Sequence, residues 1–214
     1  MKNFEAVSVA TCNRMPIYLK ALYAIKERGD KYVSSVALAE IVRENPSVVK
    51  KDLSIAIKSV GKPKVGYEVK KLIEDVEDFL GYNNVKGAVL VGVGKLGQAL
   101  LGYPGFAKYG LDIVAGFDVS KCLIGREING KKILASDNLA KSIKEMNVKI
   151  GILTTPKEIA QEMADELVKG GVRAIWNFTP CHLDLPQRVT VKNEDMASSL
   201  AILSKQLEEI LSKE

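Results

Sequence analysis

Six residues, Gly92-Val93-Gly94-Lys95-Leu96-Gly97, form the part of the sequence with the clearest chemical consequence. They follow the apolar run 88–91 and open a stretch with helical spacing. At such a strand-to-helix turn the first glycine permits the bend, the second lets the backbone approach a pyrophosphate, and the third lets helix and strand pack closely. The first amides of the helix then point at the phosphates. The spacing therefore predicts a dinucleotide-binding βαβ unit.

One carboxylate stands where the adenosine ribose of that dinucleotide would lie. Asp118 ends the second predicted strand, 21 residues after Gly97, and the acid that binds the ribose hydroxyls is expected after ~20 residues. Because a carboxylate repels a 2′-phosphate, Asp118 favours NAD+ and NADH over their phosphorylated counterparts. Lys121 is the nearby residue that would weaken this preference.

Groups for catalysis or metal binding are sparse. A dehydrogenase needs an acid or base beside the nicotinamide, but the single histidine, His182, lies in a predicted loop without a recognisable partner. Cys12, Cys122 and Cys181 form no C-x-x-C pair, so we expect neither a zinc site nor a disulfide framework. The sequence therefore predicts no catalytic residue and no metal, with the cysteines as buried apolar side chains.

The positive charge is concentrated in one segment. Residues 43–71 hold eight basic side chains against three acidic ones, which accounts for the whole net charge of +5. A locally basic segment in an otherwise balanced chain indicates an anionic partner such as nucleic acid. The alternative is a solvated, lysine-rich helix face.

Helical spacing recurs through and around the basic segment. Apolar residues indicate four helices, over about 15–28, 36–41, 47–57 and 69–80. Asn45-Pro46 separates the second from the third, and Gly61 to Tyr67 form a basic loop that can turn as a hairpin tip. Three helices and a basic hairpin are the outline of a winged helix, whose last two helices form the helix-turn-helix.

Beyond a linker at 81–84, short β-branched runs alternate with helical stretches. The predicted strands are 88–91, 112–116, 149–153, 172–176 and 189–191. Such alternation indicates a parallel sheet covered on both faces. Thr155-Pro156-Lys157-Glu158 has the pattern of a capping box at the start of a helix. We therefore expect an α/β fold, with a winged helix followed by a Rossmann-type doubly wound parallel sheet.

The last predicted helix, 196–211, carries an apolar stripe of Met196, Leu200, Leu203, Leu207 and Ile210. Such a stripe packs either on its own domain or on a second subunit, and the pattern leaves both open. No apolar run reaches the ~18–20 residues that span a bilayer, and the N-terminus lacks the layout of a signal peptide. We therefore expect a cytoplasmic protein with no membrane partner.

Several short segments, taken together, resemble a known family. They are Asn13-Arg14-Met15, Ser34-Ser35, Leu38-Ala39-Glu40, Lys51-Asp52-Leu53-Ser54, Val65-Gly66-Tyr67-Glu68-Val69, Ala99-Leu100, Tyr103-Pro104-Gly105-Phe106, Phe117-Asp118, Asn177-Phe178-Thr179-Pro180 and Asn193-Glu194-Asp195-Met196. In this combination the chain resembles, over nearly its full length, the Rex family of bacterial redox-sensing transcriptional repressors. The resemblance implies a repressor that binds operator DNA while NAD+ predominates and releases it when NADH rises.

The resemblance also implies a homodimer and a division of the chain. Its parts would be a winged-helix DNA-binding domain at 1–83, a Rossmann NAD(H)-binding domain at 84–194, and a C-terminal dimerisation helix at 195–214 that is exchanged between subunits. The expected cofactor-binding residues are Gly92, Val93, Gly94, Lys95, Leu96, Gly97, Tyr103, Asp118, Thr154, Asn177, Thr179 and Pro180. The expected DNA-binding residues are Lys50, Lys51, Ser54, Lys58, Lys62 and Lys64.

The resemblance further suggests how cofactor state reaches the DNA. Our hypothesis is that Asp195 changes partner, pairing with Arg14 of a winged helix in one state and with Tyr103 in the other. Without the family, Asp195 is an ordinary solvated aspartate at a helix N-terminus, stabilised by the helix dipole.

The chain departs from the family pattern at several positions. Lys95 replaces an asparagine of the phosphate loop, and Lys50 replaces an arginine, which loses the bidentate fork that reads guanine. Ile55-Ala56-Ile57 replaces an aromatic pair and a glycine, so the operator sequence is left open. The alternative function is a small NAD-dependent oxidoreductase whose N-terminal helices serve dimerisation.

Overall fold

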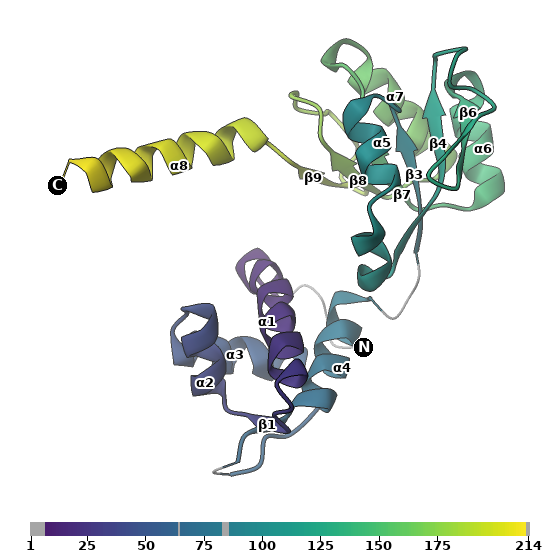
Figure 1. Ribbon diagram of the computed structural model, residues 1–214. Helices are drawn as coiled ribbons and strands as arrows, with labels where there is room; N and C mark the ends of the chain where they lie inside the picture. The colour runs from purple at the N-terminus through teal and green to yellow at the C-terminus, as the bar shows by residue number, and fades with distance from the viewer. Residues whose placement is uncertain (1–6, 64, 83–85, 213–214) are drawn as a thin grey trace. The chain divides into compact units, whose positions relative to one another are not determined.

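The computed structural model describes residues 7–63, 65–82 and 86–212, so Lys64 lies outside the described residues. The chain divides into two compact units, Met1–Asn84 (unit 1) and Val85–Glu214 (unit 2). Each unit has its own hydrophobic core, and the two are described separately below (Figure 1).

Unit 1 is a helical unit with a two-stranded sheet. Its helices are α1 (Val9–Glu27), α2 (Ser35–Val42), α3 (Pro46–Ala56) and α4 (Val69–Leu80). Strands β1 (Tyr32–Val33) and β2 (Tyr67–Glu68) pair antiparallel, and the chain between α3 and β2 turns tightly where Lys62 bridges Gly66. This arrangement agrees with the predicted winged helix, with α2 and α3 as the helix-turn-helix. The segment between α3 and β2, which contains most of the predicted hairpin tip 61–67, is called the wing below.

Side-chain caps fix where the helices of unit 1 begin. Ser8 accepts a hydrogen bond from the Thr11 amide, so α1 starts well before the expected residue 15. Ser34 caps α2, and Asn45 caps α3 with Pro46 in the first turn. The predicted break at Asn45-Pro46 is thus confirmed, because asparagine suits the cap and proline suits the first helical position.

Unit 2 is built on a seven-stranded sheet. The strands are β3 (Lys86–Val91), β4 (Leu111–Asp118), β5 (Glu127–Ile128), β6 (Lys131–Ala135), β7 (Ile150–Leu153), β8 (Ala174–Asn177) and β9 (Thr190–Asn193). Their order is β5-β6-β4-β3-β7-β8-β9, and every neighbouring pair is parallel except β5 with β6. From β6 to β9 this is the strand order 3-2-1-4-5-6 of a dinucleotide-binding fold. The predicted Rossmann fold is confirmed.

Helices cover both faces of this sheet (Figure 1). One face packs against α6 (Leu139–Met146) and α7 (Lys157–Gly170), which contribute Ile143 and Leu167 to the core. The other packs against α5 (Lys95–Leu101) and the 3₁₀ segment η2 (Pro104–Tyr109), which contribute Leu101 and Phe106. Burial on both faces explains why the central strands β3 and β7 are almost entirely apolar over 88–91 and 150–153.

Two expectations for unit 2 need correction. The predicted capping box is wrong: α7 begins at Lys157, Pro156 occupies the N-cap with extended backbone (φ −56°, ψ 150°), and no side chain caps the helix. The ψ of Pro156 excludes it from the first helical turn, so Thr155 cannot reach the amide of Glu158 as a cap would. The sequence reading also missed β5, β6 and α6, which together fill residues 127–146.

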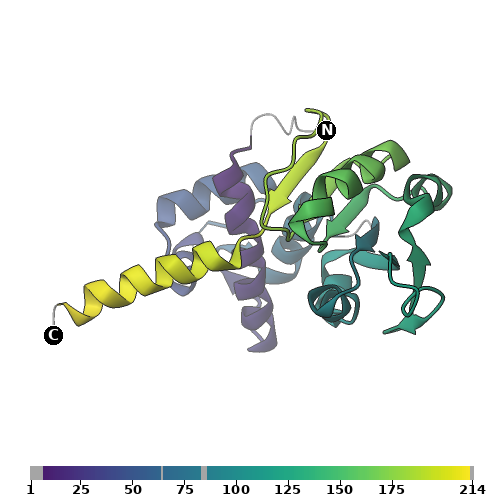
Figure 2. The ribbon, with the colours of Figure 1, turned by 90° about the horizontal axis from the view of Figure 1, so that it is seen from above.

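The last helix, α8 (Met196–Leu211), has the bounds predicted for it. The helix projects away from the strands and other helices of unit 2, as two perpendicular views show (Figures 1 and 2). Its large apolar side chains are more than half exposed: Leu200, Ile202, Leu203, Leu207, Ile210 and Leu211. None of the helices in the described part of the chain is long and apolar enough to cross a membrane.

Candidate cofactor site and nucleic-acid interface

The glycine loop joins β3 to α5, and its three glycines differ in what they allow. Gly92 has φ +96°, and a Cβ there would lie 2.9 Å from the backbone of Thr154. A Cβ on Gly97 would collide with the carbonyl oxygen of Gly92, so only glycine lets α5 pack this closely on the loop. A Cβ on Gly94 would meet nothing within 4 Å. The fold itself therefore does not require glycine at position 94, but a ligand lying against this backbone would.

Asp118, at the end of β4, lies beside this loop. Its Oδ2 accepts a hydrogen bond from the Val93 amide at 2.6 Å, and its Oδ1 accepts one from the Ser120 amide at 2.8 Å. The two bonds fix the carboxylate, and each oxygen keeps a second lone pair for a ligand hydroxyl. Asp118 thus holds the loop and presents a negative charge at the same place.

A cavity of about 410 Å³ opens at this point. It lies at the carboxyl ends of β3, β4 and β7, where the strand order reverses, which is the place at which doubly wound sheets bind ligands. Of the predicted cofactor residues, Gly92, Gly94, Asp118 and Thr154 line it. Sequence reasoning missed its other walls, which are Val91, Val119, Ser136, Thr155, Pro156, Ile159 and Met163.

The remaining loop residues lie beside this cavity rather than in its wall. Val93 and Gly97 are buried, Leu96 is half-buried, and the side chain of Lys95 is exposed. Thr154, which directly follows β7, connects that strand to the glycine loop, because its Oγ1 donates a hydrogen bond to the Gly92 carbonyl at 2.6 Å. Among the described residues, the buried Oγ1 of Thr155 finds no hydrogen-bond partner.

Tyr103 lies at the start of η2, away from the 410 Å³ cavity, and begins a row of aromatic rings. Tyr103 and Phe106 are 4.9 Å apart between ring centroids, Phe106 and Trp176 are 5.6 Å apart, and Trp176 and Phe178 are 4.8 Å apart. The row connects the segment after α5 with the end of β8. It thereby joins Tyr103 to the predicted loop 177–180.

The loop after β8 is organised by one buried amide. Asn177 has no exposed surface; its Oδ1 accepts hydrogen bonds from the amide and hydroxyl of Thr179, and its Nδ2 donates to the Cys181 carbonyl. Thr179 and Pro180 line a second cavity of about 660 Å³, together with Asp195. The structure therefore places Gly92, Gly94, Asp118 and Thr154 at one cavity and Thr179 and Pro180 at another, while Tyr103 lines neither of them.

The predicted DNA-binding residues lie on α3 and the wing. Lys50, Lys51 and Ser54 are exposed on α3. In the wing, Lys58 forms an exposed ion pair with Asp78 at 3.2 Å. The Nζ of Lys62 lies 5.4 Å from the centroid of the Tyr32 ring. These side chains present positive charge to a polyanion from one helix and one loop.

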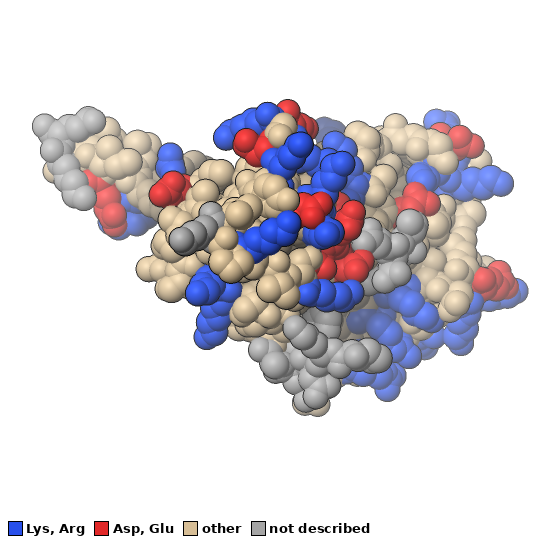
Figure 3. Space-filling view, turned by 90° about the horizontal axis from the view of Figure 1, so that it is seen from below, with Lys and Arg blue, Asp and Glu red and all other residues tan. Residues whose placement is uncertain are grey.

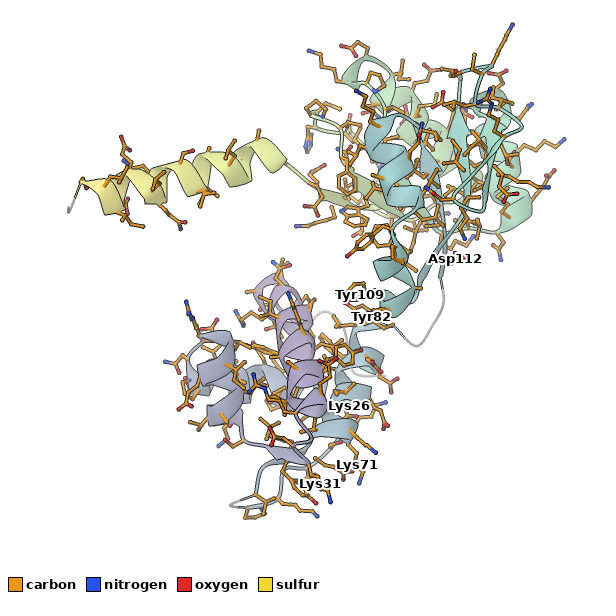
Figure 4. All side chains as sticks on the ribbon, viewed as in Figure 1. Lys26, Lys31, Lys71, Tyr82, Tyr109 and Asp112 are labelled. Atoms are coloured by element: carbon orange, nitrogen blue, oxygen red, sulfur yellow. The ribbon has the colours of Figure 1, made fainter. Side chains whose placement is uncertain are left out.

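Further lysines of unit 1 lie outside the segment that the sequence singled out. Lys26 and Lys31 line a cavity of about 340 Å³ together with Lys70, and Figure 4 shows Lys26, Lys31 and Lys71 on one side of the unit. Asp30 and Glu68 line the same cavity, and Figure 3 shows basic and acidic side chains interspersed rather than separated. The basic surface of unit 1 therefore extends beyond residues 43–71 and is partly balanced by acids.

A buried carboxylate connects α3 to α1. Asp52 is 2% exposed and accepts hydrogen bonds from the Nε and Nη2 of Arg14, the hydroxyl of Tyr18 and the hydroxyl of Thr11, at 2.6–2.9 Å. Burial alone would raise the pKa of Asp52, but the hydrogen bonds from Arg14, Tyr18 and Thr11 bring it below its usual range. Burial and the bond to Asp52 raise the pKa of Tyr18 to about 12. Helix α3 is thus connected to α1 through an ion pair between Asp52 and Arg14.

The three residues of the hypothetical switch have the following places. Arg14 is in unit 1 and pairs with Asp52, while Tyr103 and Asp195 are in unit 2. Asp195 caps α8, accepting hydrogen bonds from the amides of Ala197 and Ser198.

Among the residues that the structure describes, no group of three His, Cys, Asp or Glu side chains is arranged to hold a metal ion.

Comparison with family models and curated proteins gives consistent results. A family model described as "CoA binding domain" matches residues 83–181, and one described as "Putative DNA-binding protein N-terminus" matches residues 6–54. The redox-sensing transcriptional repressor Rex of Bacteroides fragilis is 42% identical over 206 residues, covering 96% of this chain and 93% of that protein. The protein of the same name from Treponema denticola is 44% identical over 203 residues, covering 95% of this chain and 96% of its own.

Comparison with solved structures agrees over the full length. RSP in complex with beta-NAD+ and operator DNA has a TM-score of 0.90 at 32% identity, covering 97% of this chain and 96% of that one. RSP in complex with beta-NADH has a TM-score of 0.87, also at 32% identity, covering 97% of this chain and 98% of that one.

Proposed function

Because the chain belongs to the Rex family of redox-sensing transcriptional repressors, we propose that it couples NAD(H) binding in unit 2 to operator binding in unit 1. It binds its operator while NAD+ predominates and releases it when NADH rises. One observation carries the cofactor half of this proposal: Gly94 lines the 410 Å³ cavity, and no atom of the described residues lies within 4 Å of a Cβ placed there. A pyrophosphate bound against the loop backbone would explain why position 94 is a glycine.

The adenosine half of the cofactor would lie in the 410 Å³ cavity, with the ribose hydroxyls on Asp118 and the phosphates on the Gly92–Gly97 loop. Thr154 holds the loop by its bond to Gly92. Tyr103 and the 177–180 loop would flank the nicotinamide, as the resemblance implies. The fixed carboxylate of Asp118 supports NAD(H) over NADP(H), because a 2′-phosphate would meet its negative charge.

The DNA would be bound by the exposed side chains of α3 and by the wing. Lys50, Lys51 and Ser54 face solvent on α3, so they can reach a groove or a phosphate. Lys58 and Lys62 add positive charge in the wing, and Lys64 follows Lys62 by two residues in the sequence. A repressor works where its operator is, so we place the protein in the cytoplasm.

The protein would act without catalytic turnover. Its single histidine, His182, is exposed on the loop after β8 and lines the 660 Å³ cavity. A hydride-transferring enzyme of the alternative kind needs an acid or base with an orienting partner beside the nicotinamide. Turnover of NADH with alcohols, aldehydes or hydroxy acids would favour that alternative.

The functional form would be a homodimer joined through α8. Six large apolar side chains on this helix are more than half exposed in the single chain, and a second copy would cover them. In the switch that the resemblance suggests, Asp195 would exchange partners between Arg14 of unit 1 and Tyr103 of unit 2. Since Asp52 already occupies the Nε side of Arg14, Asp195 would have to bind the other edge of the guanidinium or displace Asp52.

Binding to genomic DNA fragments, measured with and without each cofactor, tests the proposal. We expect selective retention of a few fragments with NAD+ or no cofactor, and their release by NADH. Gly94→Val should retain DNA but ignore NADH, whereas Lys51→Ala should bind NADH but retain DNA weakly. A protein with no preference over random DNA under any cofactor condition would contradict the proposal.

A further inference from the structure

The three residues that lead into α8 are each anchored differently. The Oδ1 of Asn193 accepts a hydrogen bond from the Nδ2 of Asn177 at 2.8 Å. The Oε1 of Glu194 accepts one from the indole Nε1 of Trp176 at 2.9 Å. Asp195 caps the helix. The bond of Glu194 connects the N-terminal end of α8 to Trp176, a residue that belongs neither to the predicted nor to the proposed cofactor site.

Trp176 occupies the centre of the aromatic row. Its ring is tilted by 51° against Phe178 and meets Phe106 edge-on at 68°, and Phe106 meets Tyr103 edge-on at 70°. Phe106, Trp176 and Phe178 pack against the core of the sheet. Phe106 and Phe178 contact the indole directly, and rings packed together cannot move independently, so a displaced Phe106 or Phe178 shifts the indole as well. Tyr103 is 54% exposed and reaches the indole only through its contact with Phe106.

We infer that Glu194 is a positioning residue for the redox response. Its bond to Trp176 transmits a displacement of the aromatic rings at the nicotinamide end of the cofactor to the N-terminus of α8. Glu194 directly precedes Asp195, so a shift of its backbone also moves the helix cap. The inference rests on the proposed function, because it needs a nicotinamide at the Tyr103 end of the row.

The chemistry of the pair suits an element with two discrete states. An indole has one N–H and accepts no hydrogen bond, so this donor is either given to Glu194 or must find water. Both side chains are half-buried, and a bond to an ionised acceptor in such a place is shorter and stronger than a neutral one. A small rotation of the ring therefore makes or breaks a defined contact instead of stretching it gradually.

Matched variants separate this role from simple packing. Trp176→Phe keeps an aromatic ring and removes the N–H; Glu194→Ala removes the acceptor; Glu194→Gln keeps an oxygen that can accept. The measured quantity is the ratio of the DNA dissociation constants with and without saturating NADH. We expect Trp176→Phe and Glu194→Ala each to reduce this ratio at least about fivefold, the lower end of typical coupling between sites. The double variant should be no worse than either single one, and Glu194→Gln should retain most of the response.

Tryptophan fluorescence gives a second, independent measurement of the Trp176–Glu194 bond. Trp176 is the only tryptophan of the chain, so intrinsic tryptophan emission reports on this pair alone. Loss of the hydrogen bond in Glu194→Ala should shift the emission maximum, while Glu194→Gln should emit as the unmodified protein does. If Trp176→Phe unfolds, the comparison of Glu194→Ala with Glu194→Gln decides alone, since neither variant alters the ring.

Two results would overturn the inference. One is a full NADH response in both Trp176→Phe and Glu194→Ala; the other is additive losses in the double variant, which would show that the two residues act separately. Failure of the unmodified protein to bind NADH or to release DNA would instead contradict the proposed function. NADH affinity without DNA distinguishes these cases, and in the Glu194 variants it should stay within about threefold if only the coupling is lost.

Discussion

Gly94 and Gly97 belong to the same loop and are glycines for different reasons. We predict that Gly94→Val abolishes NADH binding, because its side chain would fill the space of the pyrophosphate. The free energy of unfolding should fall by only about 1 kcal/mol, since valine is a poorer N-cap than glycine for α5. Calorimetric titration with NADH and urea unfolding measure the two quantities.

Gly97→Ala is the matched control in that experiment. Its Cβ would collide with the Gly92 carbonyl, so this variant should lose stability as well as binding. If Gly94→Val bound NADH as tightly as the unmodified chain, the loop would not be the phosphate site.

Asp52 predicts a specific dependence of stability on pH. Its pKa is lowered in the folded chain, so its contribution to stability is fully present above the ordinary aspartate pKa of about 3.9 and disappears as the pH falls through the lower folded value. At pH 7 Asp52→Ala should cost on the order of 3 kcal/mol, because it leaves Arg14, Tyr18 and Thr11 without their acceptor. Urea unfolding followed by circular dichroism between pH 2 and 7 measures both effects.

The difference between Asp52→Ala and the unmodified protein should shrink as the pH falls through the lowered folded pKa of Asp52, below which the carboxylate is protonated in both states. A difference that stays constant across the range would mean that the charge of Asp52 contributes nothing. Asp165→Ala, which removes an exposed carboxylate from α7 in unit 2, is the matched control.

At the scale of elements, the wing and α3 should contribute to DNA binding through charge. Lys62→Ala and Lys51→Ala should each weaken binding to all sequences and reduce the slope of log K against log salt by about one. Lys58→Ala should have a smaller effect, because Asp78 already compensates part of its charge. Lys205→Ala on α8, whose lysine pairs with Glu208, should leave the slope unchanged. A salt slope that none of the unit 1 variants changes would place the DNA elsewhere.

Elements with complete local signals were predictable from the sequence. The helix α3 was found because Asn45-Pro46 marks its start, and α8 because its apolar stripe is regular. The hairpin of β5 and β6 was missed although Asn129-Gly130 carries the signal: both residues have positive φ, as a two-residue hairpin turn requires. β5 has only two residues, and β6, with the sequence Lys-Lys-Ile-Leu-Ala, does not alternate polar and apolar side chains. Missing these strands also hid Ser136 in the cavity wall.

Contacts between distant residues were not predictable. Arg14 and Asp52 are 38 residues apart, and nothing in either segment indicates that a charge will be buried between them. The same holds for Trp176 and Glu194, whose contact depends on β9 lying beside β8. The glycine motif, by contrast, was readable because its three glycines lie within six consecutive residues of the sequence.

For the whole molecule, α8 decides the oligomeric state that we propose. A chain ending at Asp195 should sediment as monomers or aggregate, because each leucine buried between subunits contributes ~1.5–3 kcal/mol. Leu203→Glu with Leu207→Glu should do the same without shortening the chain, and Lys205→Ala should leave the dimer intact. Stable dimers of the truncated chain at micromolar concentration would show that another surface joins the subunits.

The exposed apolar face of α8 also has a consequence for inheritance. If copies of the chain associate only through this helix, a cell that makes two versions of the protein forms mixed pairs. A version with α8 intact and α3 damaged would capture normal subunits into inactive pairs, so such an allele would be dominant. A version that lacks α8 could capture none, and its allele would be recessive.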